Sequence, residues 1–230
     1  MPLKGDVDLS KSDTGPVTPD PSPPPRPAPA PAHRQGDLFG AAAPLPLPEG
    51  MVYEPGFLSA EEESGLLQWI ATLDLHEAQY KEYTARRRVA SFGHRYDFGA
   101  NRLLPADPVP AELLPLRERV ARWADTPAAS FTSALVAEYR PGTPLGWHRD
   151  VPDHELVVGV SLASAARMRL RRYPPEAARA ADTLSLELEP RSVYRLAGEA
   201  RWGWQHAIAA TPALRYSITF RTPRARGARR

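Results

Sequence analysis

Apolar residues recur at helical spacing in two stretches of the chain. The first follows Ser59 and Glu62, which have the three-residue spacing of a capping box at a helix N-terminus. The apolar positions of the two stretches are Leu66, Leu67, Ile70 and Leu73, and then Leu113, Leu116, Val120 and Trp123. This periodicity predicts helices over about residues 59–73 and 111–124.

The pattern changes after residue 130, where short segments rich in Val, Leu, Ile and Tyr alternate with breaks rich in Gly, Pro and Ala. Segments of this kind at regular intervals predict β-strands. They cover residues 133–140, 156–163, 167–173, 183–188, 191–197, 204–209 and 214–222. Two helices followed by these strands predict an α+β fold that is mainly β. We expect a jelly roll (a double-stranded β-helix) with the helices packed outside.

Proline divides the chain into regions. Of the 27 prolines, 13 lie in residues 1–48, where they alternate with serine, alanine and arginine. Such a segment has too little apolar surface to bury, so we expect a disordered tail. The folded domain is predicted over residues 49–223, and a short basic C-terminal tail over residues 224–230.

The composition restricts the chemistry. The chain has no cysteine, which excludes disulfides, thiolate metal sites, iron–sulfur clusters and cysteine nucleophiles. A formal net charge of +2 and a pI near 9.0 permit a polyanionic partner without requiring one. The sequence contains neither a run of about 18 apolar residues nor a secretory leader. We therefore expect a soluble, cytoplasmic protein that is monomeric and has no membrane partner.

Three residues form a candidate metal site. His148 and Asp150 lie two apart on an extended segment, so their side chains point to the same face. His206 follows on a late predicted strand. Two histidines and one carboxylate are the ligands of the facial triad that holds iron(II) and leaves three coordination positions open. Histidines with a purely structural role are the alternative, and His76 and His154 are expected to be solvent-exposed bystanders.

The last predicted strand alternates polar and apolar residues. Its polar face consists of Arg215, Ser217, Thr219 and Arg221. Two arginines inside a jelly roll are costly unless an anion neutralises them. A dicarboxylate cosubstrate gripped by guanidinium groups would do so. The alternative is a strand whose polar face is solvated.

Together these motifs resemble the AlkB family of 2-oxoglutarate dioxygenases over roughly residues 50–222. The resemblance rests on Glu138 to Asp150, on Gly198 to His206, and on the arginine strand. It implies that His148, Asp150 and His206 bind Fe(II) and carry the catalysis. The residues implied in binding 2-oxoglutarate are Tyr139 and Arg215 at the distal carboxylate, Arg221 near the keto-acid end, and Ser217 on the same strand.

Two positions depart from the founding bacterial pattern. Ala137 and Ser217 stand where that pattern has asparagine. Ser217, and the five-residue step from Arg201 to His206, look more like the branch of the family that modifies the wobble position of tRNA. A tRNA-modifying or protein hydroxylase therefore stays open as an alternative. A non-enzymatic jelly-roll binding module is the second alternative.

The resemblance implies oxidative demethylation of N-alkylated bases such as 1-methyladenine and 3-methylcytosine in DNA or RNA, with release of formaldehyde and succinate. The base must leave its stack and be clamped by aromatic side chains. Residues 86–98 interleave arginines with rings and end like the family's lid segment. The substrate-binding candidates are Tyr96 and Phe98 for stacking, Arg88 and Arg95 for phosphates, and Trp147 beside the metal ligand. Arg169, Arg171 and Arg172 form a second basic strip.

The proline-rich tail contains one short island, Gln35-Gly36-Asp37-Leu38-Phe39. It resembles the peptides by which bacterial DNA enzymes bind the replication sliding clamp. A linear motif in a disordered tail is a common way to tether an enzyme. The alternative is a local apolar patch that packs on the domain.

Overall fold

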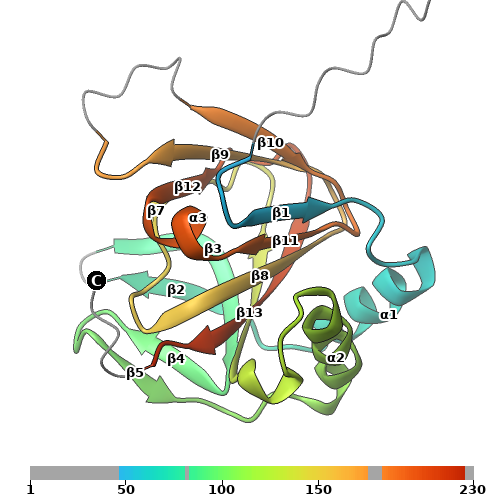
Figure 1. Cartoon of the computed structure of the whole chain (residues 1–230). Coiled ribbons are helices and arrows are strands. Elements are labelled where there is room, and N and C mark those ends of the chain that lie inside the picture. Colours follow the sequence, from blue (N-terminus) through green and yellow to red (C-terminus); the bar gives the residue numbers. More distant parts are fainter. Residues whose placement is uncertain (1–46, 81–82, 176–182, 226–230) are drawn as a thin grey trace, which may run out of the picture. The chain divides into compact units, whose positions relative to one another are not determined.

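The computed structural model describes residues 47–80, 83–175 and 183–225 (Figure 1). The chain divides into a unit of residues 1–44, which lies outside the described residues, and a unit of residues 45–230. The fold and the site belong to the second unit. The clamp-like island Gln35–Phe39 therefore lies outside the described residues, and the division into tail and domain stays a prediction.

Both predicted helices form, and their ends follow from local chemistry. Helix α1 (Ala60–Ile70) begins at the predicted capping box: the Ser59 hydroxyl accepts from the Glu62 amide, and the Glu62 carboxylate accepts from the Ser59 amide. The second helical region starts as the 3₁₀ turn η1 (Ala111–Leu113) and continues as α2 (Leu114–Trp123). Two shorter pieces complete the helical content, namely η2 (Ala128–Ser130) and α3 (Gly198–Trp202).

Antiparallel strands make up the body of the domain. The larger sheet has the order β1 (Met51–Glu54), β11 (Val193–Leu196), β8 (His154–Leu162), β13 (Arg215–Pro223), β6 (Ser133–Tyr139), β3 (Tyr83–Phe92) and β2 (His76–Tyr80). The smaller sheet has the order β10 (Leu184–Leu188), β9 (Ala166–Arg172), β12 (Trp204–Ile208) and β7 (Leu145–His148). A separate hairpin pairs β4 (His94–Asp97) with β5 (Arg102–Pro105). The predicted mainly β jelly roll with outer helices is confirmed.

All seven strands predicted after residue 130 are present, but six strands were not predicted. Five of them lie in residues 51–105, and the sixth is β7. Strand β3 contains the run Arg86, Arg87 and Arg88, which hides the alternation of apolar residues. It forms because β2 and β6 pair with it on either side. The pairing of strands distant in sequence decided this region, since its own pattern is weak.

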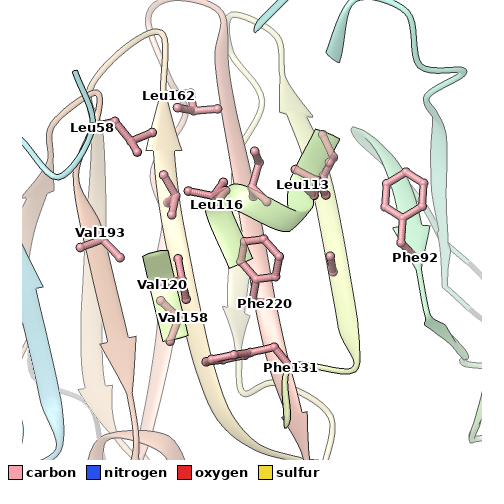
Figure 2. Packing of buried hydrophobic residues seen from close by; sticks show 14 of the residues in the cluster. Leu58, Phe92, Leu113, Leu116, Val120, Phe131, Val158, Leu162, Val193 and Phe220 are labelled. Atoms are coloured by element: carbon pink, nitrogen blue, oxygen red, sulfur yellow. The ribbon is translucent and has the colours of Figure 1, made fainter. Parts of the chain in front are cut away.

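The larger sheet has two differently used faces. Apolar residues of β8 and β13 pack against the two helices, with Val158, Leu162 and Phe220 on one side and Leu116 and Val120 on the other (Figure 2). The opposite face turns towards the smaller sheet, where Met168, Leu170 and Leu196 form a second core cluster. Residues two apart on a strand share a face, so the apolar side chains of β13 anchor it to the helices. Its polar side chains are thereby placed between the two sheets.

Candidate metal centre and cosubstrate pocket

The three predicted metal ligands meet at one point between the sheets. His148 ends β7 and lies directly opposite His206 of the neighbouring strand β12, and their ring centroids are 4.2 Å apart. Asp150 follows β7, and its Oδ2 lies 3.7 Å from His206 Nε2. One donor atom from each residue lies within 4.8 Å of the others. Within the described residues this is the one group of three or more His, Asp or Glu that could hold a metal ion.

The protonation states suit metal binding. Burial, reinforced by the neighbouring His148, lowers the pKa of His206 to about 3, and burial also lowers the pKa of His148. Burial by itself would raise the pKa of Asp150, but the charges of Arg221 and the two histidines outweigh it and hold that pKa well below its usual value. At neutral pH the site therefore presents two neutral imidazoles and one carboxylate, and Arg221, the largest of the lowering influences on Asp150, stays charged. This donor set is the one expected for a facial Fe(II) centre.

Neighbouring groups orient these ligands. His148 Nδ1 lies 2.9 Å from the Gly146 carbonyl oxygen, to which it can donate, leaving Nε2 for a metal. Arg221 Nε donates to Asp150 Oδ1 at 2.8 Å. The buried Arg201 donates to the carbonyl oxygens of Asp150, Val151 and His154 at 2.7 to 3.0 Å, which holds the turn that carries the carboxylate.

Arg215 fits a bound carboxylate. Its side chain is only 1% exposed, its Nε donates to Ser161 Oγ at 3.1 Å, and its guanidinium carbon lies 4.9 Å from the ring centroid of Tyr139. Its Nη1 is buried and has no hydrogen-bond partner among the described residues. A buried cation with an unsatisfied donor is costly unless an anion binds there. A narrow cavity joins Arg215, Tyr139 and Ser217 to the metal ligands, so all four predicted cosubstrate residues, including Arg221, line one space.

The phenol of Tyr139 belongs to the same electrostatic cluster. Its burial would raise the pKa, but the charges of Arg87 and Arg215 outweigh this and lower it. Arg87 lines both the narrow cavity and the larger one described next. The sequence indicates phosphate contacts for the whole run Arg86–Arg88 and does not distinguish Arg87 within it, because only strand direction decides which guanidinium points inward.

A larger cavity of about 640 Å³ opens over the metal ligands. Four predicted substrate residues line it: Arg95 and Tyr96 from β4, Phe98 just beyond, and Trp147 from β7. The Tyr96 and Phe98 rings meet edge to face with centroids 4.9 Å apart, and the Tyr96 hydroxyl donates to Asn101 Oδ1 at 2.7 Å. The structure therefore brings these residues together in one cavity with the metal ligands His148 and Asp150.

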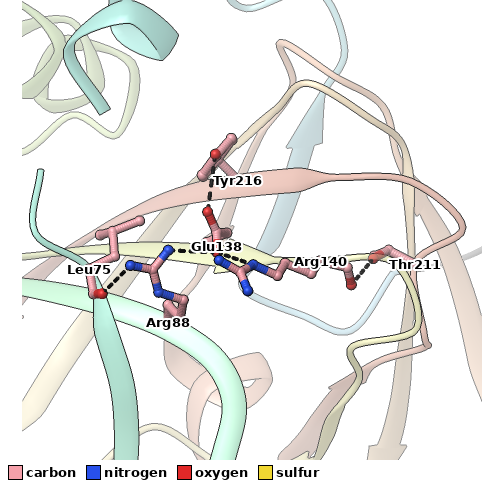
Figure 3. A network of polar contacts seen from close by, with 6 residues as sticks. All are labelled: Leu75, Arg88, Glu138, Arg140, Thr211 and Tyr216. Atoms are coloured by element: carbon pink, nitrogen blue, oxygen red, sulfur yellow. Dashed lines mark hydrogen bonds and ion pairs between the residues drawn. The ribbon is translucent and has the colours of Figure 1, made fainter. Parts of the chain in front are cut away.

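The fifth predicted substrate residue, Arg88, is not among the residues that line this cavity. Its guanidinium donates to the Glu138 carboxylate at 3.3 Å and to the Leu75 carbonyl at 2.6 Å. Glu138 also accepts from Arg140 and Tyr216, so Arg88 belongs to a polar network separate from the triad (Figure 3). Neighbouring residues of a strand face opposite ways, which sends Arg87 to the cavity and Arg88 away from it.

The prediction that His154 is solvent-exposed is wrong. Its side chain is 5% exposed, burial lowers its pKa to about 3, and it lines the larger cavity. His76 is exposed as predicted, but it too lines that cavity. The polar surroundings of His154 in the sequence gave no sign of burial, since β8 begins at this residue and continues into the core.

The architecture and the site define a class: a jelly roll with a two-histidine, one-carboxylate metal centre beside a buried arginine suited to a dicarboxylate. A model of the 2OG-Fe(II) oxygenase superfamily matches residues 50–221. The chain belongs to this superfamily, and Fe(II) and 2-oxoglutarate are its cofactors.

The chain is also similar to individual known proteins. It is 28% identical over 180 residues to an Arabidopsis thaliana protein named "Alkylated DNA repair protein ALKBH8 homolog", covering 69% of this chain and 50% of that protein. It is 25% identical over 169 residues to the Mus musculus protein "tRNA (carboxymethyluridine(34)-5-O)-methyltransferase ALKBH8", covering 70% of this chain and 24% of that protein. The chain thus spans half or less of the length of the curated relatives that it matches. A solved structure titled "The structure of OsALKBH1" superposes with a TM-score of 0.61 at 16% identity, covering 77% of this chain and 100% of that one, which shows the fold.

These findings confirm the resemblance to the AlkB family and the assignment of Fe(II) and 2-oxoglutarate. They leave the substrate to be proposed. Among the described residues, no helix is long and apolar enough to cross a membrane.

Proposed function

We propose that this protein is a dioxygenase that removes methyl groups from N-alkylated bases in DNA or RNA, with 1-methyladenine and 3-methylcytosine as substrates. One observation carries the proposal: the larger cavity is lined both by the metal ligands His148 and Asp150 and by the aromatic side chains of Tyr96, Phe98 and Trp147. A cavity of about 640 Å³ lies within the usual range for small-molecule sites, so an extruded base has room in it.

The residues of the chain have distinct tasks in this reaction. When bound, iron(II) and 2-oxoglutarate would supply the oxidising chemistry together with O₂. One oxygen atom would go to 2-oxoglutarate as it is converted to succinate and CO₂, and the other would go to the methyl carbon, which is lost as formaldehyde. His148, Asp150 and His206 fix the geometry of the metal, and Arg215 and Tyr139 hold the cosubstrate. Tyr96 and Phe98 stack on the base and exclude water, and Arg95 binds the adjacent phosphate.

A second candidate is the oxidation of a modified base in tRNA. It is favoured by Ser217, which stands where the founding pattern has asparagine, and by the name of the mouse relative, which refers to a carboxymethyluridine in tRNA. A protein hydroxylase has no specific observation in its favour. A non-enzymatic binding module is disfavoured, because it leaves the buried Nη1 of Arg215 without a partner.

The test is turnover with iron(II), ascorbate and 2-oxoglutarate, read by mass spectrometry for loss of the methyl group. The substrates are single-stranded DNA and RNA that carry 1-methyladenine or 3-methylcytosine, and tRNA anticodon stem-loops with a modified wobble uridine. Methyl loss that disappears in His148→Ala supports the proposal. Oxidation of the stem-loop alone favours the second candidate. Production of succinate without oxidation of any nucleic acid contradicts both.

A matched pair of variants tests whether the lining of the larger cavity binds the substrate. Arg95→Gln removes a guanidinium that lines the cavity, and Arg88→Gln removes one that points to Glu138 instead. We expect Arg95→Gln to raise KM for a methylated strand several-fold and Arg88→Gln to leave it unchanged. Equal effects of the two changes would contradict the placement of the substrate.

The tail motif is proposed as a tether to the replication sliding clamp. A pull-down with the clamp is expected to lose the protein on Phe39→Ala. Retention of that variant on the clamp at the wild-type level would contradict the proposal. A monomeric state and a cytoplasmic location stay predictions.

A further inference from the structure

Two arginines of β9 lie against the indole of Trp147. Residues 167, 169 and 171 alternate with the buried Met168 and Leu170, so their side chains share the outer face of the smaller sheet. The guanidinium carbons of Arg169 and Arg171 lie 5.0 and 4.4 Å from the Trp147 ring centroid, within the range of cation–π contacts. The sequence separates Trp147 from β9, and only the strand order β9-β12-β7 brings them together.

The same surface continues to a third cation. Arg149 lies two residues beyond Trp147, its guanidinium carbon is 3.7 Å from the ring centroid of Tyr173, and its Nη1 donates to the Trp202 carbonyl at 2.9 Å. Arg171 Nε donates to Gln205 Oε1 at 2.8 Å. We call Arg149, Arg169 and Arg171 with Trp147 the arginine–tryptophan surface.

The charges of this surface are not neutralised within the part of the chain that the structure describes. None of its three arginines forms an ion pair with a carboxylate there, whereas Arg172, the next residue of β9, lies 3.6 Å from Glu199 and over Trp204. The basic strip predicted from sequence therefore divides. Arg169 and Arg171 join Arg149 beside the cavity, and Arg172 belongs to a different cluster.

The arginine–tryptophan surface is continuous with the larger cavity, because Trp147 and Arg149 line that cavity as well. When the target nucleotide of a nucleic-acid strand enters the cavity, the nucleotides on either side of it must run over some neighbouring surface of the protein. Stacking on aromatic rings and hydrogen bonds to Gln205 and Trp202 hold the three guanidinium groups in place. Much of the entropy that ordering them would cost on binding is therefore already lost.

We propose that the arginine–tryptophan surface binds the phosphate backbone of the single-stranded nucleic acid that flanks the nucleotide in the cavity. This inference rests on the proposed function and adds to it a second contact region, outside the cavity, that is independent of base identity. Guanidinium groups are suited to phosphates by geometry and by weak hydration. Arginines that only covered Trp147 would repel one another without compensation, and an apolar side chain would cover the indole without that repulsion.

The surface is tested by the salt dependence of strand binding. The holoenzyme with iron(II) and 2-oxoglutarate, kept free of oxygen, is titrated with an unmethylated single strand of about twelve nucleotides at several salt concentrations. Each phosphate contact contributes about 0.7 to the slope of log K against log salt for single strands. The slope is negative. We therefore expect its magnitude to decrease by about 0.7 in Arg169→Gln and in Arg171→Gln, and by about 1.4 in the double variant.

Arg122→Gln serves as the matched control. Arg122 is exposed in the last turn of α2, which packs on the other face of the larger sheet, and the change removes the same charge. The control is expected to keep the wild-type slope. A double variant with the slope of this control would overturn the inference. Binding of poly-glutamate in preference to the strand would overturn it as well, in favour of an acidic protein partner.

Turnover separates this inference from the proposed function. The double variant should retain the wild-type kcat and KM on a methylated mononucleotide, which has no flanking phosphates, and show a raised KM on the longer methylated strand. A KM that rises equally on both substrates would overturn the inference, since it would place the arginines in the cavity. If the wild type demethylates nothing and the binding slope still falls in the variants, the surface stands and the proposed function fails.

Discussion

Replacing Arg215 by methionine should separate folding from cosubstrate binding. The guanidinium is buried, one of its nitrogens has no partner among the described residues, and its positive charge faces the metal site. Replacing a buried ion pair by apolar side chains of similar size is often neutral or stabilising by about 1–4 kcal/mol, and a buried charge without a partner is costlier than a paired one. We therefore expect the protein without cosubstrate to unfold at the same or a higher urea concentration after Arg215→Met.

The effect on 2-oxoglutarate should be the opposite. Removing one partner of a buried, hydrogen-bonded charge pair costs about 2–5 kcal/mol. This corresponds to an affinity lower by about 30-fold to about 4,000-fold. In the wild type, 2-oxoglutarate at 100 times its Kd should stabilise the folded state by about 2.7 kcal/mol. At the same concentration the variant should gain at most about 0.9 kcal/mol, the value for a 30-fold lower affinity.

The assay is urea unfolding with iron(II) in the absence of oxygen, with and without 2-oxoglutarate. Arg140→Met is the control, because Arg140 follows Tyr139 in the chain but its side chain is 62% exposed and pairs with Glu138. A variant that keeps its 2-oxoglutarate stabilisation would refute the reasoning. So would a large loss of stability without cosubstrate, because Arg215 would then be a structural residue whose charge is satisfied within the protein.

Three further predictions concern the metal, the pH dependence and the core. His206→Ala should lower Fe(II) affinity by more than about 100-fold in calorimetry, since a ligand contributes more than its supporting residues do, and an unchanged affinity would contradict the triad. His154 has a pKa of about 3 in the folded protein and an ordinary value of 6.5, so the unfolded chain binds the extra proton and stability falls as pH drops from 6.5 towards 3. Between pH 7.5 and pH 5 this protonation should lower the free energy of unfolding by about 2 kcal/mol. In urea unfolding, His154→Gln should lack this part of the pH dependence. An unaltered pH dependence in the variant would show that His154 does not cause it. Phe220→Ala should cost about 3–5 kcal/mol in the same assay, because its ring is fully buried and meets Phe131 edge to face; a loss below about 1 kcal/mol would mean that the site collapses around the cavity.

Local patterns in the sequence determined much of this protein. The capping box at Ser59 and Glu62 placed the first helix, because it depends only on residues within one turn. The alternation along residues 215–221 assigned Arg215 and Ser217 to one face of a strand, because successive side chains of a strand point to opposite sides. The spacing of His148 and Asp150 indicated the metal site for the same reason.

Tertiary structure decided the remaining features, which depend on which strands become neighbours. The register of β7 on β12 sets His206 opposite His148, although their positions differ by 58 in the sequence numbering. Pairing of β3 between β2 and β6 sends Arg87 to the cavity and Arg88 to Glu138. Burial of His154 and the contacts of Trp147 with β9 have the same origin. Strand pairing, burial and the field of distant charges arise from contacts between segments far apart in the chain, and no local pattern encodes them.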